Sequence, residues 1–309
     1  MHLLSICAKV LALFAFLVLT AWTACAQFTD PRNYENFPVG VNQVEVTYDY
    51  ARANESIDQS IVIEGAHLNL NQWTVSYMRY FSLFGRMAWV SPSIPLAALN
   101  GTVTGTNVNG SVAGAGDSSY EFAWLLRGGP ALSPEEFEKY KPTTVIGVSL
   151  NVTAPTGQYR ADKVLNLGSD RWSFRPEIGL SHPFGPEQKW TFDAYANSYF
   201  YTDNTSYRSG EILRQGPLPA FEGHISYTFG ERVVASLDAR YSFRGDTSLD
   251  GVGQNDSQKN FVVGSEAIVT LNAKNQMTFI FEKAAVHVNG PAVTGVAVRY
   301  DYYWGRGYK

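Results

Sequence analysis

The chain has 309 residues, of which 24 are Lys or Arg, 28 are Asp or Glu and two are Cys. Charged residues make up 17% of the chain and aromatic residues 14%, so it is poor in charge beside a typical soluble domain with about 25%. The 45% hydrophobic content excludes an intrinsically disordered chain, and the net charge of −4 gives no reason to expect nucleic acid as a partner.

The first 26 residues have the pattern of a cleaved secretory signal peptide. An apolar run over 10–21 is too short to span a bilayer, which takes about 20 residues. Ala-Cys-Ala at 24–26 fits a cleavage site, which predicts a mature chain that begins at Gln27 and contains no cysteine. A membrane-anchored helix and a lipoprotein with lipidated Cys25 are the two alternatives.

Beyond the signal peptide, apolar and polar residues alternate along the whole chain. Examples of this pattern are the segments 44–50, 120–127, 144–153, 172–180, 190–197, 221–229, 233–244, 261–271 and 296–304. Successive side chains of a strand point to opposite faces, so each segment has one apolar face and one face that admits charge. A secreted β-sandwich would share this pattern.

Three features favour a membrane barrel over the sandwich. The segments reach about 10 residues, the length of a membrane-spanning strand. Trp and Tyr gather near the ends of the apolar faces, as at Trp172, Trp190, Tyr302 and Trp304. Connections alternate between long and short, and strands that cross lipid must close into a barrel because every backbone group there needs a partner.

The connections set the strand count. Long polar connections fall near 53–71, 93–117, 155–170, 202–217 and 245–258, and short ones near 81–84, 182–188, 229–232 and 272–275. Outer-membrane barrels have long external loops and short periplasmic turns. The sequence therefore predicts an all-β, transmembrane, antiparallel up-and-down β-barrel of about 12 strands over 41–309, with both termini in the periplasm.

Other segments complicate this count. The connection 129–142 is long although it should be periplasmic, and Ser133 followed by Pro134 and acidic residues predicts a short capped helix there. The connection 288–291 is short although it should be external. Partial alternation over 57–70 leaves 14 strands as the alternative.

Segment 27–40 precedes the first predicted strand and contains two prolines. We expect it to form a periplasmic N-terminal segment. A plug or gate inside the lumen is the alternative for these residues.

Several sequence pieces together resemble a known family. They are the stretch 80–86, Gly114 to Asp117 after a Gly-rich loop, 150–157, 171–180 and 250–256, in that order over about three quarters of the chain. In these pieces and their order, the chain is similar to the outer-membrane transporter family associated with the meta-cleavage pathway of phenol degradation. The resemblance implies a β-barrel channel that passes aromatic or other hydrophobic compounds.

The inward-facing positions hold the candidate functional residues. We expect these channel-lining residues: Arg175, Glu177, Asp193, Tyr195, Asp238, Arg240, Glu266 and Arg299. Tyr199, Tyr201 and Tyr303 share the phase of Tyr195, and this set could stack a flat aromatic solute or pack the wall. No catalytic residue, cofactor or metal site is predicted.

One cluster of residues offers an enzyme as an alternative interpretation. Glu222, His224 and Ser226 share one face of one predicted strand, and some outer-membrane lipid esterases use a His-x-Ser arrangement. These residues take the lumen phase, however, whereas a lipid would approach the apolar face. A hydrogen-bonded cluster in the lumen is the expected role.

The sequence thus predicts a channel of the bacterial outer membrane for passive passage of small, hydrophobic or aromatic solutes. Its expected partners are outer-membrane lipid, the solutes and the barrel-assembly machinery, which reads an aromatic C-terminus. Tyr308 keeps the aromatic phase of the last strand, although Lys309 follows it. A structural or adhesive barrel without an open pore is the second function considered, and a lipid ester hydrolase the third.

Overall fold

The computed structural model describes residues 29–53, 66–103, 109–163, 165–208, 210–290 and 292–308. The predicted signal peptide lies outside these residues. The strands of the main sheet are β1 (Val41–Ala53), β2 (Ala66–Leu83), β3 (Arg86–Val103), β4 (Asn109–Ala115), β5 (Ser119–Arg127), β6 (Val145–Thr153), β7 (Ser173–Phe184), β8 (Trp190–Tyr201), β11 (Leu218–Phe229), β12 (Val233–Arg244), β15 (Gln258–Asn272), β16 (Asn275–Val288) and β17 (Thr294–Gly305).

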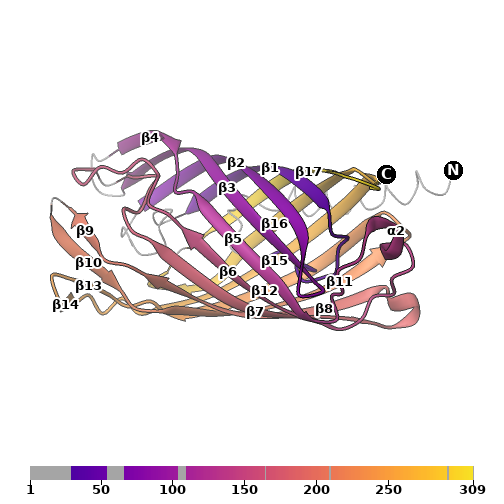
Figure 1. Ribbon diagram of the computed structural model, residues 1–309. Helices are drawn as coiled ribbons and strands as arrows, with labels where there is room; N and C mark the ends of the chain where they lie inside the picture. Colours follow the sequence, from indigo (N-terminus) through magenta and orange to yellow (C-terminus); the bar gives the residue numbers. More distant parts are fainter. Residues whose placement is uncertain are drawn as a thin grey trace.

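The sheet closes on itself as a barrel of tilted strands (Figure 1). Strand β1 pairs with β2 on one side and with the last strand, β17, on the other, and β2 pairs with β3. Twelve strands form the ring, each antiparallel to its neighbours, and β4 adds to one end of β3. The prediction of a 12-stranded antiparallel barrel is confirmed.

The two ends of the barrel differ (Figure 1). The C-terminus, helix α2 (Pro134–Phe137) and the 3-10 turn η1 (Pro186–Gln188) lie at one end, which we call the turn end. At the other end, the mouth, the long connections carry a small second sheet. This sheet consists of β9 (Asn204–Tyr207), β10 (Glu211–Gln215), β13 (Thr247–Leu249) and β14 (Val252–Gly253).

The short helix in connection 129–142 was predicted correctly. Ser133 is its N-cap, and its side chain accepts a hydrogen bond from the amide of Glu136, whose own side chain accepts from the Ser133 amide. This reciprocal capping box satisfies two amides that a free helix end would leave unpaired. No helix in the described part of the chain is long and apolar enough to cross a membrane.

The segment 93–117, expected as a long loop, is in part strand. Strand β3 continues to Val103, and β4 returns along it with Ala115 opposite Leu96. The Gly, Ser and Thr content of this stretch favours a loop by propensity, but pairing along β3 satisfies its backbone, which explains the difference.

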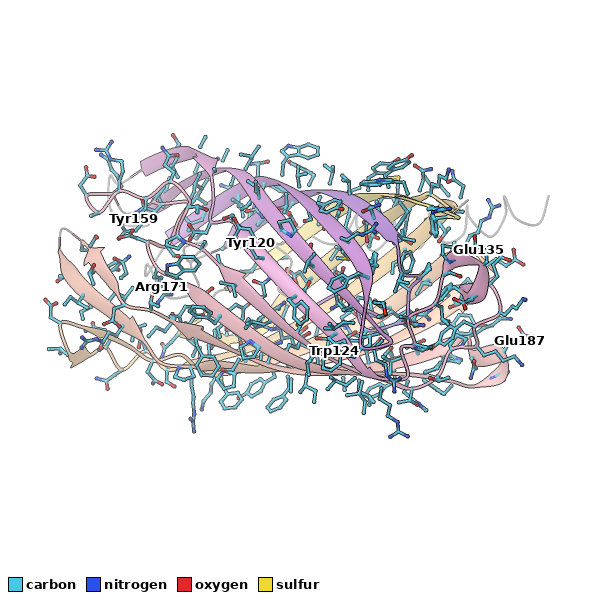
Figure 2. All side chains as sticks on the ribbon, viewed as in Figure 1. Tyr120, Trp124, Glu135, Tyr159, Arg171 and Glu187 are labelled. Carbon is cyan, nitrogen blue, oxygen red and sulfur yellow. The ribbon has the colours of Figure 1, made fainter. Side chains whose placement is uncertain are left out.

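The two faces of the strands differ as the alternation predicts. The outer face exposes large apolar side chains, such as Trp73, Phe122, Ile178, Phe221 and Leu237. Figure 2 shows side chains that project outward from the barrel. Polar and charged side chains are buried on the inner face. A soluble protein shows the opposite distribution, so the outer surface is built for contact with lipid acyl chains.

Candidate functional site: the occupied lumen and the mouth cavity

The described part of the N-terminal segment, residues 29–40, lies inside the barrel, and we call it the plug. The amide of Thr29 donates to Glu222 Oε2 at 2.7 Å, and its hydroxyl donates to Glu177 Oε2 at 2.8 Å. The amide of Arg32 donates to Asp193 Oδ2 at 3.1 Å. These carboxylates stand on the inner faces of β7, β8 and β11, so the structure corrects the expectation of a periplasmic tail for these residues.

The centre of the plug is Tyr34, whose side chain is fully buried. Its hydroxyl donates to Glu177 Oε1 at 2.9 Å and lies 3.1 Å from Ser149 Oγ. Its ring packs against Trp89 and Tyr195, with centroids 6.0 and 5.4 Å away. Burial and the neighbouring Glu177 carboxylate raise the pKa of Tyr34, so it stays a neutral donor.

The plug ends in contacts at the turn end of the barrel. The amides of Val39 and Gly40 donate to the carbonyls of Leu132 and Tyr80, and the Asn36 side chain donates to the carbonyl of Pro130. The ring of Phe37 packs among aromatic rings from three parts of the chain, with centroid distances of 4.6 to 6.3 Å: Tyr80, Phe137, Tyr303 and Tyr308. This end of the plug is therefore held by backbone hydrogen bonds and apolar contact.

The remaining side of the plug pairs with Arg299. The guanidinium of Arg299 contacts the carboxylate of Asp30, and it lies 3.8 Å from Glu45 Oε2 and 3.6 Å from Asp301 Oδ2. One cation thus serves three carboxylates, one from the plug and two from β1 and β17.

The structure does not form a hydrolase triad from Glu222, His224 and Ser226. His224 Nδ1 pairs with Asp238 Oδ1 at 2.8 Å, and the Ser226 hydroxyl accepts from Arg32 Nε at 2.8 Å. All three residues lie buried beneath the plug. Their contacts are those of the hydrogen-bonded cluster that the sequence favoured.

The eight residues predicted to line a channel all stand on the inner faces of the strands. Five of them contact the plug: Arg175, Glu177, Asp193, Tyr195 and Arg299. Asp238 pairs with His224, Arg240 Nε lies 3.2 Å from Glu222 Oε1, and the backbone amide of Glu266 donates to Ser236. Contact with a passing solute stays a prediction for all eight.

The connection between β6 and β7, predicted near 155–170 as an external loop, turns inward at the mouth, and we call it the mouth loop. Leu167 packs against inner-face residues of β1, β2 and β3, and Leu165 lies beside them. That inner-face patch consists of Ala51, Leu68, Leu70, Ala97 and Leu99. These apolar side chains face the lumen at the mouth, and burying them against the leucines explains the inward turn.

Asp117 fixes the mouth loop. Its Oδ1 accepts from the amide of Gly157 at 2.7 Å, and its Oδ2 accepts from the amide and hydroxyl of Ser169 at 2.8 and 2.7 Å. A Cβ on Gly157 would lie 2.6 Å from the backbone carbon of Gly116, and one on Gly168 would lie 2.8 Å from that of Gly157. The carboxylate therefore holds both arms of the loop against the connection between β4 and β5.

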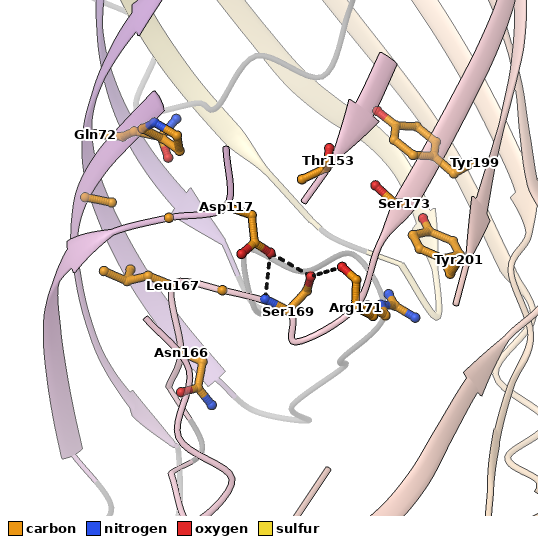
Figure 3. Close-up of a pocket in the computed structure, with 14 residues that line it drawn as sticks. Gln72, Asp117, Thr153, Asn166, Leu167, Ser169, Arg171, Ser173, Tyr199 and Tyr201 are labelled. Carbon is orange, nitrogen blue, oxygen red and sulfur yellow. Dashed lines mark hydrogen bonds between the residues drawn. The ribbon is translucent and has the colours of Figure 1, made fainter. Parts of the chain in front are cut away.

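A cavity of about 220 Å³ opens between the mouth loop and the wall, and we call it the mouth cavity. Tyr199 and Tyr201 stand on the side opposite Leu167 and Gln72 (Figure 3). The Arg171 guanidinium lies 4.1 Å from the centroid of the Tyr201 ring, and the two tyrosine rings are nearly parallel, at 9°. Pro95 and Ala97 complete the apolar side, while Ser173 and Thr153 add hydroxyls.

Sequence reasoning did not assign Asp117, Ser169 and Arg171 to a site. The available signal was the set of motif pieces at 114–117, 150–157 and 171–180, which the structure brings together around the mouth loop. Because these pieces are far apart in the chain, only the fold shows that they build one feature.

Closed strands, a lipid-type outer face and an occupied polar lumen define the class as a barrel with the outer-membrane fold. The model of the family described as "Putative MetA-pathway of phenol degradation" matches residues 51–300. The chain belongs to this family, which confirms the resemblance found in the sequence.

Solved structures that are similar to this chain include the following two. The COG4313 outer membrane channel from Pseudomonas putida F1 has 21% sequence identity and a TM-score of 0.77, covering 90% of this chain and 100% of that one. The β-domain of the Bordetella autotransporter Brka has 10% identity and a TM-score of 0.52, covering 85% and 99%. Both show the fold. A search of curated proteins found no match.

Proposed function

We propose that this protein is an outer-membrane channel through which small solutes, chiefly hydrophobic or aromatic ones, pass without an energy source. The mouth cavity carries the proposal. Its volume of about 220 Å³ exceeds that of one aromatic ring, and two tyrosine rings line it opposite an apolar side. Ring stacking of this kind adds about 0.5–1.5 kcal/mol per pair beyond area burial.

The plug represents the closed state in this proposal. It occupies the lumen between the mouth cavity and the turn end, so a solute leaves the cavity inward only when the plug shifts. Its contacts are of two kinds. Residues 29–35 bind the wall through polar groups and the ring of Tyr34, whereas Phe37, Val39 and Gly40 anchor it at the turn end. The first part is the one that moves, because polar contacts can exchange with water.

The location supports the same function. The exposed apolar outer face and the fold shared with an outer membrane channel support insertion in the outer membrane, with the signal peptide as the export signal. The turn end would face the periplasm, as short turns do in barrels of this type.

Liposome swelling tests the proposal. The full-length protein is reconstituted in liposomes, and swelling rates are compared over sugars, aliphatic acids and phenols of similar mass. Faster swelling with the phenols than with the sugars is expected. Equal rates for all solutes would contradict the aromatic preference, and no swelling or ion current at all would contradict the channel.

A structural barrel without a pore is the second candidate. The observation in its favour is the dense set of hydrogen bonds and ion pairs between the plug and the wall. Planar bilayer recordings separate the two, since a locked lumen passes no current. The third candidate, a lipid ester hydrolase, would require Ser226→Ala to abolish hydrolysis, whereas the Ser226 contact with Arg32 predicts no such activity.

A further inference from the structure

The inner faces of the twelve strands carry far more acid than base. In the described chain, the carboxylates there are Glu45, Asp49, Glu121, Glu177, Asp193, Glu222, Asp238, Glu266, Glu282 and Asp301. The basic groups there are Arg175, Arg240 and Arg299, together with His224, which pairs with Asp238. A lumen with this excess attracts cations and repels anions, as rings of Asp and Glu do in cation channels.

The plug does not balance this excess. It brings Asp30 and Glu35 but only one basic side chain, Arg32. Arg32 Nε is already committed to Ser226 Oγ at 2.8 Å and lies 3.7 Å from Glu35. The lumen therefore stays acidic whether the plug is docked or shifted.

The wall guanidiniums are committed as well. Arg240 lies beside Glu222, and Arg299 serves Asp30, Glu45 and Asp301. Arg175 lies over the Tyr199 ring at 5.7 Å, next to the mouth cavity. None of these three forms an ion pair with Glu266 within the described residues.

Because the three arginines pair elsewhere, Glu266 is left near other acidic side chains without a cation of its own in the described part of the chain. Its side chain is almost fully buried, at 4% exposure, and no residue that the structure describes donates a hydrogen bond to its Oε2. Burial is the largest influence on this carboxyl and disfavours its charged form; Asp30, Asp238 and Glu282 act in the same sense, with Arg299 as the opposing cation. Such a carboxyl carries its negative charge only when a cation joins it, because an unpaired buried charge costs several kcal/mol.

We propose that the lumen selects cations over anions and that Glu266 is a principal determinant of this selectivity. The inference rests on the proposed channel function and adds the charge of the favoured solute to it. Cations, inorganic or organic, would enter past Glu266, neutral aromatic solutes would be tolerated, and anions would be turned back by the acidic wall.

The reversal potential of the full-length protein in a planar bilayer tests this, with a KCl gradient across the membrane. The wild type is expected to pass K⁺ in preference to Cl⁻. Glu266→Gln should lower the K⁺/Cl⁻ permeability ratio at least about two-fold, the factor that one charge at about 8 Å gives even in water. Glu187→Gln, which removes the same charge from an exposed turn at the turn end (Figure 2), should leave the ratio unchanged.

The outcomes separate the two proposals. Folding of each variant is checked first by its shifted migration in unheated SDS gels, and Glu282→Gln replaces Glu266→Gln if the latter does not fold. Anion selectivity, or an equal ratio in the wild type and the lumen variant, overturns the selectivity and leaves the channel standing. Absence of any current overturns the channel and the selectivity together.

Discussion

The ring of Tyr34 fills the space that a side chain at Gly179 would need. A Cβ added at Gly179 would lie 2.1 Å from Tyr34 Cε2, and one added at Gly147 on the neighbouring strand would lie 2.2 Å from Tyr34 Cδ1. The two glycines face each other across β6 and β7 in register. Together they form a recess in the wall that matches one aromatic side chain of the plug.

Gly179→Ala should therefore displace the plug. The new methyl group cannot coexist with the docked ring, and overpacking of this kind costs about 1–3 kcal/mol. We expect faster liposome swelling than with the wild type. Gly223→Ala is the matched control, because a Cβ there meets nothing within 4 Å.

A double variant distinguishes plug displacement from damage to the barrel. Tyr34→Ala removes the clashing ring, so Tyr34→Ala combined with Gly179→Ala should swell no faster than Tyr34→Ala alone. If the Gly179 substitution adds its full effect in that background, the recess is not where the plug docks.

Arg299→Gln should destabilise the folded protein strongly. The substitution leaves the carboxylates of Asp30, Glu45 and Asp301 without their shared cation, and breaking a buried ion pair costs about 3–5 kcal/mol. Urea unfolding in detergent micelles, followed by gel migration, measures the loss. Arg214→Gln removes an exposed pair with Asp203 and should cost at most about 1 kcal/mol; equal losses in the two variants would contradict the role given to Arg299.

Asp117→Asn should loosen the mouth loop. The carboxylate accepts three hydrogen bonds from Gly157 and Ser169, and an amide side chain can accept at only one of its two terminal atoms. We expect faster proteolytic cleavage within the loop and entry of bulkier solutes in swelling assays. Asp162→Asn, on the exposed part of the same loop, breaks ion pairs with Arg160 and Lys163 and should change neither measurement.

The barrel was predictable from the sequence because its period-two pattern is a local property. The alternation around Leu237, Asp238 and Arg240 already separates the outer face from the inner face, and the turn chemistry at Ser133 already marks a helix start. The alternation and the helix start depend only on residues that are neighbours in the sequence, so both can be recognised from the sequence alone.

The contents of the lumen could not be read in the same way. Thr29 and Glu222 are 193 residues apart, and no local pattern in the segment 27–40 shows which wall it contacts. The glycine recess is likewise invisible, since Gly147 and Gly179 look like ordinary strand glycines until Tyr34 is placed against them. Likewise, Asp117 stands in a Gly-rich stretch that favours a loop by propensity, and its partners are 40 and 52 residues away.

Replacing both Tyr199 and Tyr201 by Leu should reduce the passage of aromatic solutes. The two rings form one side of the mouth cavity, and stacking worth about 0.5–1.5 kcal/mol corresponds to a roughly two- to ten-fold weaker hold on a flat ring. Swelling rates with phenols should fall toward those with sugars of similar mass, while sugar rates stay as in the wild type. Tyr241→Leu, on the outer face where the ring is 41% exposed, is the control and should leave both rates unchanged. A parallel fall for sugars and phenols would show that the tyrosines only pack the wall, which is the other role that the sequence allowed them.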